Sequence, residues 1–459
     1  MITIFENVQN ELMLFAAVGF LIGSLDDLLV DIFWLARTLW KRAFIYMRHE
    51  VMTMATLPIS PNPGPVAVFV PAWDEANVIG HMLRHCLKSW GKADFRIFVG
   101  CYPNDRATIM AVAAAAKQDE RISLVIGANA GPTTKGDCLN AIWMAMQRLE
   151  AVQGKPFKAI VLHDAEDVVH PGEIRLFDTM IERFDLVQLP VLPLVNPQSR
   201  WVSGHYCDEF AEAHGKYLVV REAIGAAMPS AGVGCAFARA AIASIADQQE
   251  GLPFDPACLT EDYELGLRIG ALGGRGVFIH MADEAGGLVC TREYFPDTLN
   301  AAVRQKARWM TGIALAGWDR LGWHGSLAER WMRLRDRRAP LAAVILCCAY
   351  VSILLYGAID IVHLALGIQG APLRPLLEIL LIINAVLLLW RLVIRCVFVT
   401  RYYGWREGAR SVPRAFLANI IAILAARQAA FHYLRINSGR APVWDKTAHH
   451  FPAELACET

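Results

Sequence analysis

Three long apolar segments constrain what this chain can fold into. They are residues 12–35, 341–359 and 376–399. Each is long enough to cross the ~30 Å hydrocarbon core of a bilayer as a helix, which takes about 20 residues. Hydrophobic residues make up 55% of the chain, more than a soluble domain usually contains. The sequence therefore predicts one transmembrane helix within residues 1–36, two within 341–400, and a soluble region between them.

Basic residues beside these segments predict their orientation. The flanks of membrane spans that face the cytoplasm are enriched in Lys and Arg. Residues 1–11 contain neither, whereas basic residues follow the first span, precede the second and follow the third. They are Arg37, Lys41, Arg42 and Arg48, then Arg330, Arg333, Arg335, Arg337 and Arg338, then Arg401, Arg406, Arg410 and Arg414. We therefore expect the N-terminus outside and the region between the spans in the cytoplasm.

A fourth apolar stretch, residues 416–434, contains Arg427. As a span it would also place Arg435, Arg440 and Lys446 outside the cell, against the charge rule. A helix at the inner interface or within the bundle is therefore favoured over a fourth span. Residues 401–459 are expected to form this cytoplasmic or membrane-associated helix and a tail.

The first apolar segment carries three carboxylates, Asp26, Asp27 and Asp31. Carboxylates within a span usually face the interior of a bundle, because an unpaired charge in lipid is costly. We expect these residues to pair with Arg391, Arg395 or Arg427.

Between the spans, apolar strands alternate with helices. The expected strands cover residues 65–75, 95–105, 122–128 and 158–167, and the expected helices cover 77–90, 107–118 and 135–149. Such alternation is typical of a mostly parallel sheet. In open sheets of this kind, ligands bind beyond the carboxyl ends of the strands.

Carboxylates gather at three of these strand ends. They are Asp74 and Glu75, then Asp105, then Asp164, Glu166 and Asp167. Crowded carboxylates repel one another unless a cation lies among them, and Mg²⁺ and Mn²⁺ prefer such oxygen ligands. A divalent metal that holds a diphosphate is one interpretation. A solvated acidic turn is the other, and the cluster alone favours neither.

The remaining composition argues against several other classes of protein. His163 and His170 flank the acidic cluster, but His205 and His214 lack the spacing that a metallohydrolase needs. The eleven cysteines form no CxxC pair, which argues against a zinc site and a disulfide framework. The balance of 44 basic and 44 acidic residues argues against a nucleic-acid binder.

Two later segments add polar residues to the candidate site. Thr260, Glu261 and Asp262 precede an amphipathic helix, where an N-cap and first-turn acids would explain their types. Residues 301–323 have a cationic face and an apolar face with tryptophans, as in a helix at a membrane interface. That interpretation does not account for Gln305 and Arg308.

Together these segments resemble the family 2 glycosyltransferases of the cellulose, chitin and hyaluronan synthase type, over residues 65–325. The acidic strand end at Glu75 matches, and the D-x-D metal motif corresponds to residues 164–166, with Glu in place of the second Asp. The T-E-D motif corresponds to 260–262 and the Q-x-x-R-W motif to 305–309. The resemblance implies an α/β GT-A fold, that of nucleotide-diphospho-sugar transferases, over residues 37–300. Interfacial helices at 301–340 and a small bundle of transmembrane α-helices would anchor it.

The resemblance also implies which residues bind the donor, a UDP-sugar. Glu75 and Asp105 would contact its base and ribose, and Lys135 and Asp137 would contact its diphosphate or uridine. Asp164 and Glu166 would bind Mg²⁺ or Mn²⁺ and, through it, the UDP.

The same resemblance implies an inverting transfer. Asp262, with Glu261 beside it, would be the general base that takes the proton of the acceptor hydroxyl. Arg308 would stabilise the leaving diphosphate, while Gln305 and Trp309 would position the acceptor sugar.

A narrower resemblance is to the glycosyltransferase part of the phage-adsorption protein B group. It is carried by GPTTKGDCLN (131–140), HDAEDVVHP (163–171) and WDKTAHHF (444–451). It implies an enzyme of the bacterial inner membrane that extends a β-linked secreted polysaccharide from UDP-GlcNAc or UDP-ManNAc. The implied partners are the donor, the growing polysaccharide, membrane lipid, an outer-membrane export protein and a second copy of the chain, but no nucleic acid. The cyclic di-GMP-binding domain common in this group is not expected in the residues given.

Two other functions stay open. One is transfer of a single sugar to a lipid carrier, which would not need the Q-x-x-R-W motif. The other is a catalytically silent membrane scaffold for polysaccharide export, against which Asp164, Glu166 and Asp262 argue.

Overall fold

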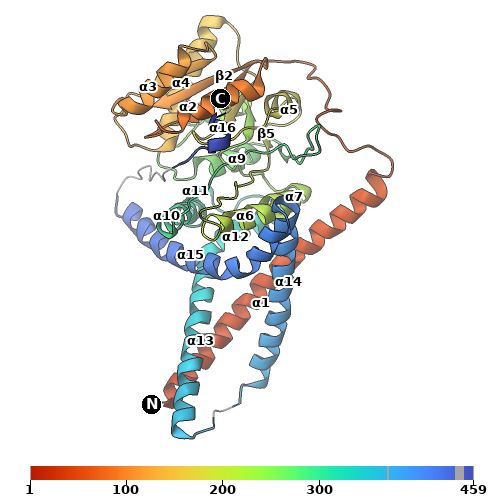
Figure 1. Cartoon of the computed structure of the whole chain (residues 1–459), viewed down its shortest axis with the longest axis vertical. Coiled ribbons are helices and arrows are strands. Elements are labelled where there is room, and N and C mark those ends of the chain that lie inside the picture. The colour runs from red at the N-terminus through yellow and green to blue at the C-terminus, as the bar shows by residue number, and fades with distance from the viewer. Residues whose placement is uncertain (1, 370–371, 440–448, 458–459) are drawn as a thin grey trace.

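The computed structural model describes residues 2–369, 372–439 and 449–457 (Figure 1). An α/β domain lies at one end, and three long helices, α1 (Ile2–Trp40), α13 (Ala339–Leu366) and α14 (Pro375–Tyr403), extend away from it. The N-terminus lies at their far end, whereas the last helix, α16 (Ala453–Cys457), returns to the α/β domain. The long helices therefore form an elongated stem below a compact head.

A seven-stranded sheet of order β3-β2-β1-β4-β6-β5-β7 forms the centre of the α/β domain. The first four strands pair in parallel, as the alternation of strands and helices predicts. β6 runs antiparallel to both of its neighbours, so the sheet is mixed. The strands are β1 Val66–Pro71, β2 Phe95–Cys101, β3 Ile122–Ile126, β4 Ala159–Leu162, β5 Leu186–Gln188, β6 Cys235–Ala238 and β7 Gly276–Phe278.

Helices cover both faces of this sheet. Those on one face bury their apolar stripes in one core cluster, and those on the other face form a second. In α2, for example, Ile79, Met82, Leu83 and Cys86 recur at helical spacing and are all buried. The first face carries α2 Ile79–Trp90, α3 Arg106–Ala116 and α5 Glu173–Met180; the second carries α4 Lys135–Gln153, α8 Arg239–Asp247 and α9 Glu261–Ala271.

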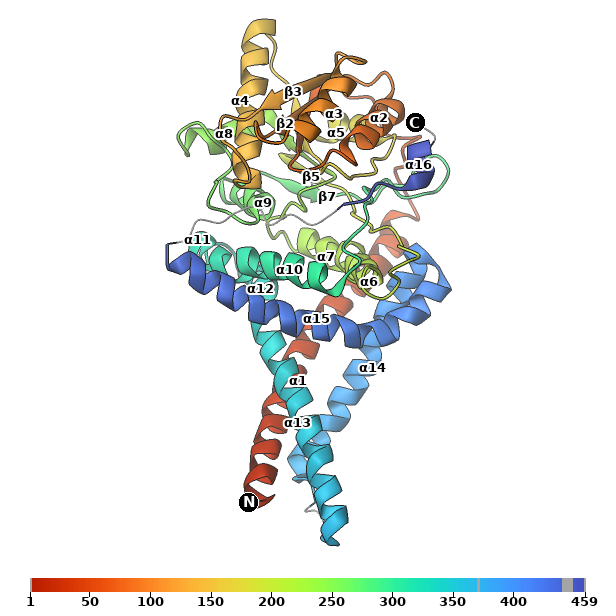
Figure 2. The same cartoon turned by 60° about the vertical axis from the view of Figure 1, so that its left-hand side comes forward.

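A layer of further helices separates the head from the stem (Figure 2). It contains α6 Gly204–Glu212, α7 Leu218–Ala223, α10 Leu299–Trp309, α11 Gly317–Leu321, α12 Leu327–Arg337 and α15 Trp405–Asn437, with π-helical segments η2 Ala213–Tyr217 and η3 Met310–Ala316. A third such segment, η1 Lys41–Ile45, continues α1. α15 packs along α10 and lies transverse to α13 and α14 in both views.

Within the described residues, four helices are long and apolar enough to cross a membrane, judged by length and composition: α1, α13, α14 and α15. The three predicted spans lie in the first three. The ambiguous stretch 416–434 lies in α15, and its position relative to a membrane stays a prediction.

The carboxylates of α1 pair only partly as predicted. Asp27 lies 2.9 Å from Arg391, as expected. Arg395 was wrongly expected to pair with α1: its guanidinium lies 2.6 Å from Glu212 of α6, and Asp31 lies 2.5 Å from Lys216 of η2. The acidic part of α1 passes through the helical layer, so its partners come from that layer as well as from α14.

Candidate active site

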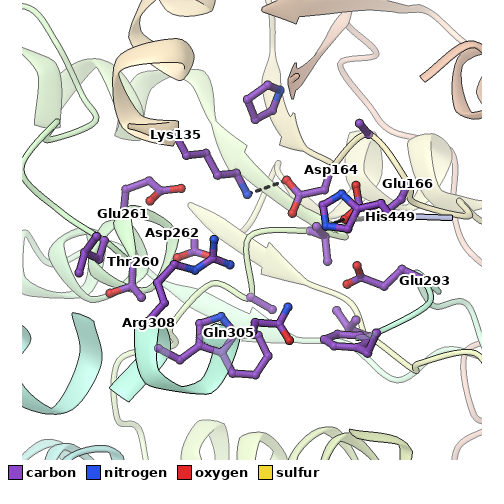
Figure 3. A pocket seen from close by; sticks show the side chains of 18 of the residues that line it. Lys135, Asp164, Glu166, Thr260, Glu261, Asp262, Glu293, Gln305, Arg308 and His449 are labelled. Carbon is purple, nitrogen blue, oxygen red and sulfur yellow. Dashed lines mark ion pairs between the residues drawn. The ribbon is translucent and has the colours of Figure 1, made fainter. Parts of the chain in front are cut away.

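A pocket opens at the carboxyl edge of the sheet, facing α10 (Figure 3). β1 and β4 pair in parallel with Phe69 opposite Leu162, so the residues that follow both strands emerge side by side. β6 is antiparallel to β4, with Cys235 opposite Leu162, and this pairing brings the loop before β6 to the same edge. Topology therefore gathers segments far apart in the sequence around one cavity.

Most of the predicted site residues meet in this pocket. Only Asp105 and Asp137 are missing from its lining. The predicted residues that line it are Glu75, Lys135, Asp164, Glu166, Glu261, Asp262, Gln305, Arg308 and Trp309.

Asp105 and Asp137 lie beside the pocket. Asp105 caps α3 by accepting a hydrogen bond from the Thr108 N–H at 3.2 Å, and it accepts another from the Asp74 N–H at 2.6 Å. Asp137 accepts a hydrogen bond from the Thr133 hydroxyl at 2.8 Å. Both carboxylates hold the chain in place near the pocket, and their contact with a nucleotide stays a prediction.

Lys135 is a cation at the centre of the lining. It begins α4, and its Nζ lies 2.6 Å from Asp164 Oδ1 (Figure 3). Burial lowers the pKa of Lys135, but the charges of Asp164, Glu261 and Asp262 outweigh burial, and the net shift of its pKa is upward. Lys135 therefore stays charged and is placed to meet an anionic ligand.

Six carboxylates share the pocket with Lys135, Arg308 and His449. Burial, together with repulsion from neighbouring carboxylates, raises the pKa of Glu166 to about 8 and that of Glu293 well above its usual range. Such a cluster is stabilised by added positive charge, and its oxygen ligands suit a divalent cation. The residues present therefore fit a divalent metal. The six are Glu75, Asp164, Glu166, Glu261, Asp262 and Glu293.

Glu75, Glu166 and His449 form a group with ligand atoms within 4.8 Å of one another. Of the two residues predicted to bind metal, which both line the pocket, one belongs to this group. Glu166 lies in this group, whereas Asp164 pairs with Lys135.

His163 has a structural role. Its ring is fully buried, with Nδ1 2.6 Å from Asp167 and Nε2 3.0 Å from Glu173. Burial lowers the pKa of His163, but the two carboxylates raise it more, to about 10. Both ring nitrogens are occupied by these partners, so the metallohydrolase interpretation finds no ligand here.

Thr260 occupies the N-cap position of α9, as the residue types suggest, but its side chain does not cap the helix. α9 begins at Glu261, but Thr260 makes no capping hydrogen bond. Its buried Oγ1 has no hydrogen-bond partner in the described part of the chain, and it packs against Gly312 of η3, where a Cβ would overlap it. Thr260 therefore serves as a contact between α9 and the helical layer, while Glu261 and Asp262 occupy the first turn of α9.

The Q-x-x-R-W residues enter the pocket from α10. Gln305, Arg308 and Trp309 are three and four residues apart, so they share one face of the helix. The buried Oε1 of Gln305 has no hydrogen-bond partner among the described residues. Trp309 packs in an aromatic cluster, with ring centroids 6.3 Å from Phe295 and 6.3 Å from Phe210. This side of the pocket is thus aromatic and offers a free acceptor atom to a ligand.

Comparison with known proteins agrees with this geometry. A family model described as "Glycosyltransferase like family 2" matches residues 63–312, more than half of the chain. The chain belongs to this family. Two curated relatives match with 36% identity: bacteriophage adsorption protein B from Escherichia coli K12 and bacteriophage N4 adsorption protein B from Escherichia coli O157:H7. Each alignment is 461 residues long and covers 95% of this chain. The chain covers 61% of the length of each relative.

A solved structure shows the same fold. The mannosyltransferase PcManGT from Pyrobaculum calidifontis, in complex with GDP-Man and Mn²⁺, matches with a TM-score of 0.54 and 14% identity. The match covers 92% of this chain and 99% of that chain. At this identity the likeness concerns the fold alone, and it supports the predicted GT-A fold of this family 2 glycosyltransferase.

Gly232 of this glycosyltransferase lies directly over Asp262. Its φ is +79°, and a Cβ at this position would overlap the Asp262 carboxylate. We expect Gly232→Ala to lower the rate of sugar transfer at least tenfold, because the new methyl group displaces that carboxylate. A rise of about 1.4 kcal/mol in the activation free energy already slows a reaction tenfold. Initial rates at saturating donor would measure the effect.

Gly225→Ala is the matched control. Gly225 has a similar φ of +73°, and a Cβ there would meet nothing within 4 Å. Both variants carry the cost of a left-handed alanine, about 1–2 kcal/mol, but only Gly232→Ala should lose activity. Equal activity in the two variants would show that the approach to Asp262 has no catalytic consequence.

Several lining residues of the glycosyltransferase pocket were not predicted from sequence. Glu293 and Phe295 follow Arg292, which forms an isolated bridge with Val168; such a pairing has no local sequence pattern. His449 lies in the tail motif WDKTAHHF, so the resemblance marked its segment but not its side chain. Residues 440–448, with the first part of that motif, lie outside the described residues.

Proposed function

We propose that this chain is a metal-dependent, inverting transferase that extends a β-linked polysaccharide from a UDP-sugar, UDP-GlcNAc or UDP-ManNAc. The observation that carries this proposal is the convergence of Asp164, Lys135, Asp262 and Arg308 on one pocket from four separate segments. Gln305, Arg308 and Trp309 of α10 line the pocket, and α10 belongs to the helical layer between the head and the stem (Figure 2). A product that forms there emerges next to the helices long enough to span a membrane.

On the donor side, Lys135 and Arg308 supply the permanent positive charge, and Asp164 and Glu166 hold the divalent cation. Bound there, Mg²⁺ or Mn²⁺ offsets the negative charge of the diphosphate, which the acidic lining alone would repel. The fold neighbour from Pyrobaculum calidifontis was solved in complex with GDP-Man and Mn²⁺, which, like the proposed ligands, are a nucleotide sugar and a divalent cation. Glu75, Asp105 and Asp137 contact the base, ribose or diphosphate.

On the acceptor side, Asp262 takes the proton of the attacking hydroxyl. As the hydroxyl oxygen bonds to the anomeric carbon, the bond from that carbon to the diphosphate breaks and UDP leaves, with inversion at the carbon. Arg308 stabilises the charge that develops on the diphosphate. Trp309 and Gln305 orient the acceptor sugar, the ring by stacking and the amide by hydrogen bonding.

The proposed function gives each region of the chain a location relative to the membrane. Residues 37–300 form the cytoplasmic catalytic domain, residues 301–340 lie at the inner membrane surface, and 1–36 and 341–400 anchor the chain in the bacterial inner membrane. Residues 401–459 remain on the cytoplasmic side as a membrane-associated helix and tail.

Purified protein in lipid nanodiscs tests the proposal. With Mn²⁺ or Mg²⁺ and a panel of UDP-sugars, we expect UDP release from one or two donors, loss of release with EDTA, and recovery when metal is restored. UDP release that persists in EDTA would contradict the proposed metal dependence. Transfer of a single sugar to extracted lipid, without polymer, would favour the lipid-carrier function, and no release with any donor would favour the scaffold.

A further inference from the structure

The C-terminal segment of the described chain docks on the α/β domain. α16 packs against α2, and the Phe451 ring stacks on His81 with 6.1 Å between centroids and an interplanar angle of 18°. Phe451 also lies 5.9 Å from the His85 ring and packs against the core cluster on that face of the sheet. Apolar contact therefore holds residues 449–457 beside the pocket, although they follow the membrane-side helix α15.

This docking carries His449 into the pocket. His449 Nδ1 lies 2.8 Å from Glu75 Oε1, and Nε2 lies 3.2 Å from Glu166 Oε1 (Figure 3). Glu75 follows β1 and Glu166 follows β4, and both are about 95% buried. The imidazole thus joins the ends of two adjacent strands to the end of the chain.

The three side chains have the chemistry and spacing of a metal site. One ligand atom from each lies within 4.8 Å of the other two, close to the width of the coordination sphere of a cation whose ligand bonds are about 2.1–2.6 Å long. Two carboxylates provide negative charge, and imidazole is a common nitrogen ligand. Because Mg²⁺ favours oxygen ligands whereas transition metals accept imidazole, this set suits Mn²⁺ better than Mg²⁺.

We propose that His449 is a ligand of the active-site divalent cation, together with Glu75 and Glu166. Binding of the cation then fixes the C-terminal segment against the pocket, and docking of that segment completes the cation site. The two events strengthen each other by the same factor, since coupling free energies are reciprocal. This inference rests on the proposed metal dependence. It adds His449 and Glu75 to the proposed ligands Asp164 and Glu166, so that Glu75 contacts the cation rather than the nucleotide, and it adds a preference for Mn²⁺.

Titration of Mn²⁺ into the full-length protein, followed by electron paramagnetic resonance without any donor, tests the inference. We expect His449→Ala to raise the dissociation constant for Mn²⁺ about 10- to 100-fold, the range typical of lost support at a metal site. His450→Ala is the matched control, because His450 is adjacent but exposed and should bind Mn²⁺ as the wild type does. Phe451→Ala, which weakens docking without removing a ligand, should give an intermediate loss.

Pulsed electron paramagnetic resonance adds a direct signature. A nitrogen bonded to Mn²⁺ produces a ¹⁴N coupling, which we expect in the wild type and in His450→Ala and not in His449→Gln. Unchanged or tighter Mn²⁺ binding in His449→Ala would overturn the inference and show that His449 acts only as a cationic bridge between the two glutamates. In that case Mn²⁺ would still bind and UDP release would still need it, so the proposed function would stand. Absence of Mn²⁺ binding in the wild type would overturn both.

Discussion

Replacing Asp262 with Asn should slow sugar transfer about 10²- to 10⁴-fold, the usual contribution of a positioned general base. Asp262 lies in the first turn of α9, beneath Gly232 and facing the pocket. Burial raises the pKa of its carboxyl group, and Lys135 counters only part of the shift, so the carboxylate is a stronger base than an exposed aspartate. Asparagine keeps the shape but accepts no proton. UDP release by the variant in nanodiscs would measure the loss.

Two comparisons separate a catalytic role from a structural one. Asp247→Asn, at the exposed end of α8, should leave the rate unchanged. Asp262→Asn should keep the wild-type affinity for UDP, because the proposed donor contacts do not involve this carboxylate. Transfer at more than a tenth of the wild-type rate would exclude Asp262 as the base and direct attention to Glu261, the next carboxylate of the same turn.

Replacing Arg414 with Ala should destabilise the protein by about 3–5 kcal/mol, the cost of breaking a buried ion pair. The Arg414 side chain is fully buried, 2.6 Å from Asp208 of α6 and 2.8 Å from Glu407 of α15. Alanine would leave both carboxylates buried without this cation and would loosen the contact of α15 with the helical layer. A thermal unfolding scan in detergent or nanodiscs should show a midpoint lower by roughly 10 °C.

Arg410→Ala is the control for this stability effect. Arg410 pairs with the same Glu407, but its side chain is 34% exposed, and exposed pairs contribute about 0–1 kcal/mol. Its midpoint should therefore stay within a few degrees of the wild type. If both variants lost the same stability, the effect would come from the charge of α15 rather than from the buried pair.

The first half of the sheet was predictable because its strands are long apolar runs. β1 through β4 fall in the four expected segments and pair in parallel. β5 and β7, by contrast, have three residues each, too few to show a period, and they exist because β6 and the core offer them partners. The four-residue β6 pairs with both β4 and β5, and so it positions the loop before it, with Gly232, over Asp262.

Residues of the candidate site could be predicted where they belong to a recognisable sequence motif. The strand ends, the start of α4, the T-E-D motif and the Q-x-x-R-W motif together supplied nine of the lining residues, and all nine lie within residues 63–312, which match the family model. His449, in the tail, lies outside that match. Residue type predicted the N-cap position of Thr260, but it could not show that the side chain packs against Gly312 and makes no capping hydrogen bond. Glu293 carried no local signal, since only its tertiary position makes it part of the pocket.

The sequence by itself determined the long apolar helices, the first four strands with the helices between them, and the types of residue at the strand ends, because hydrophobic period and length are local properties. Only the tertiary structure decided which charges meet. It pairs Asp164 with Lys135, Asp31 with Lys216, and His449 with Glu75 and Glu166. Such pairings depend on how separate elements pack against one another. The free energy that favours this packing comes mainly from burial of the whole core, and no single segment of the sequence determines it.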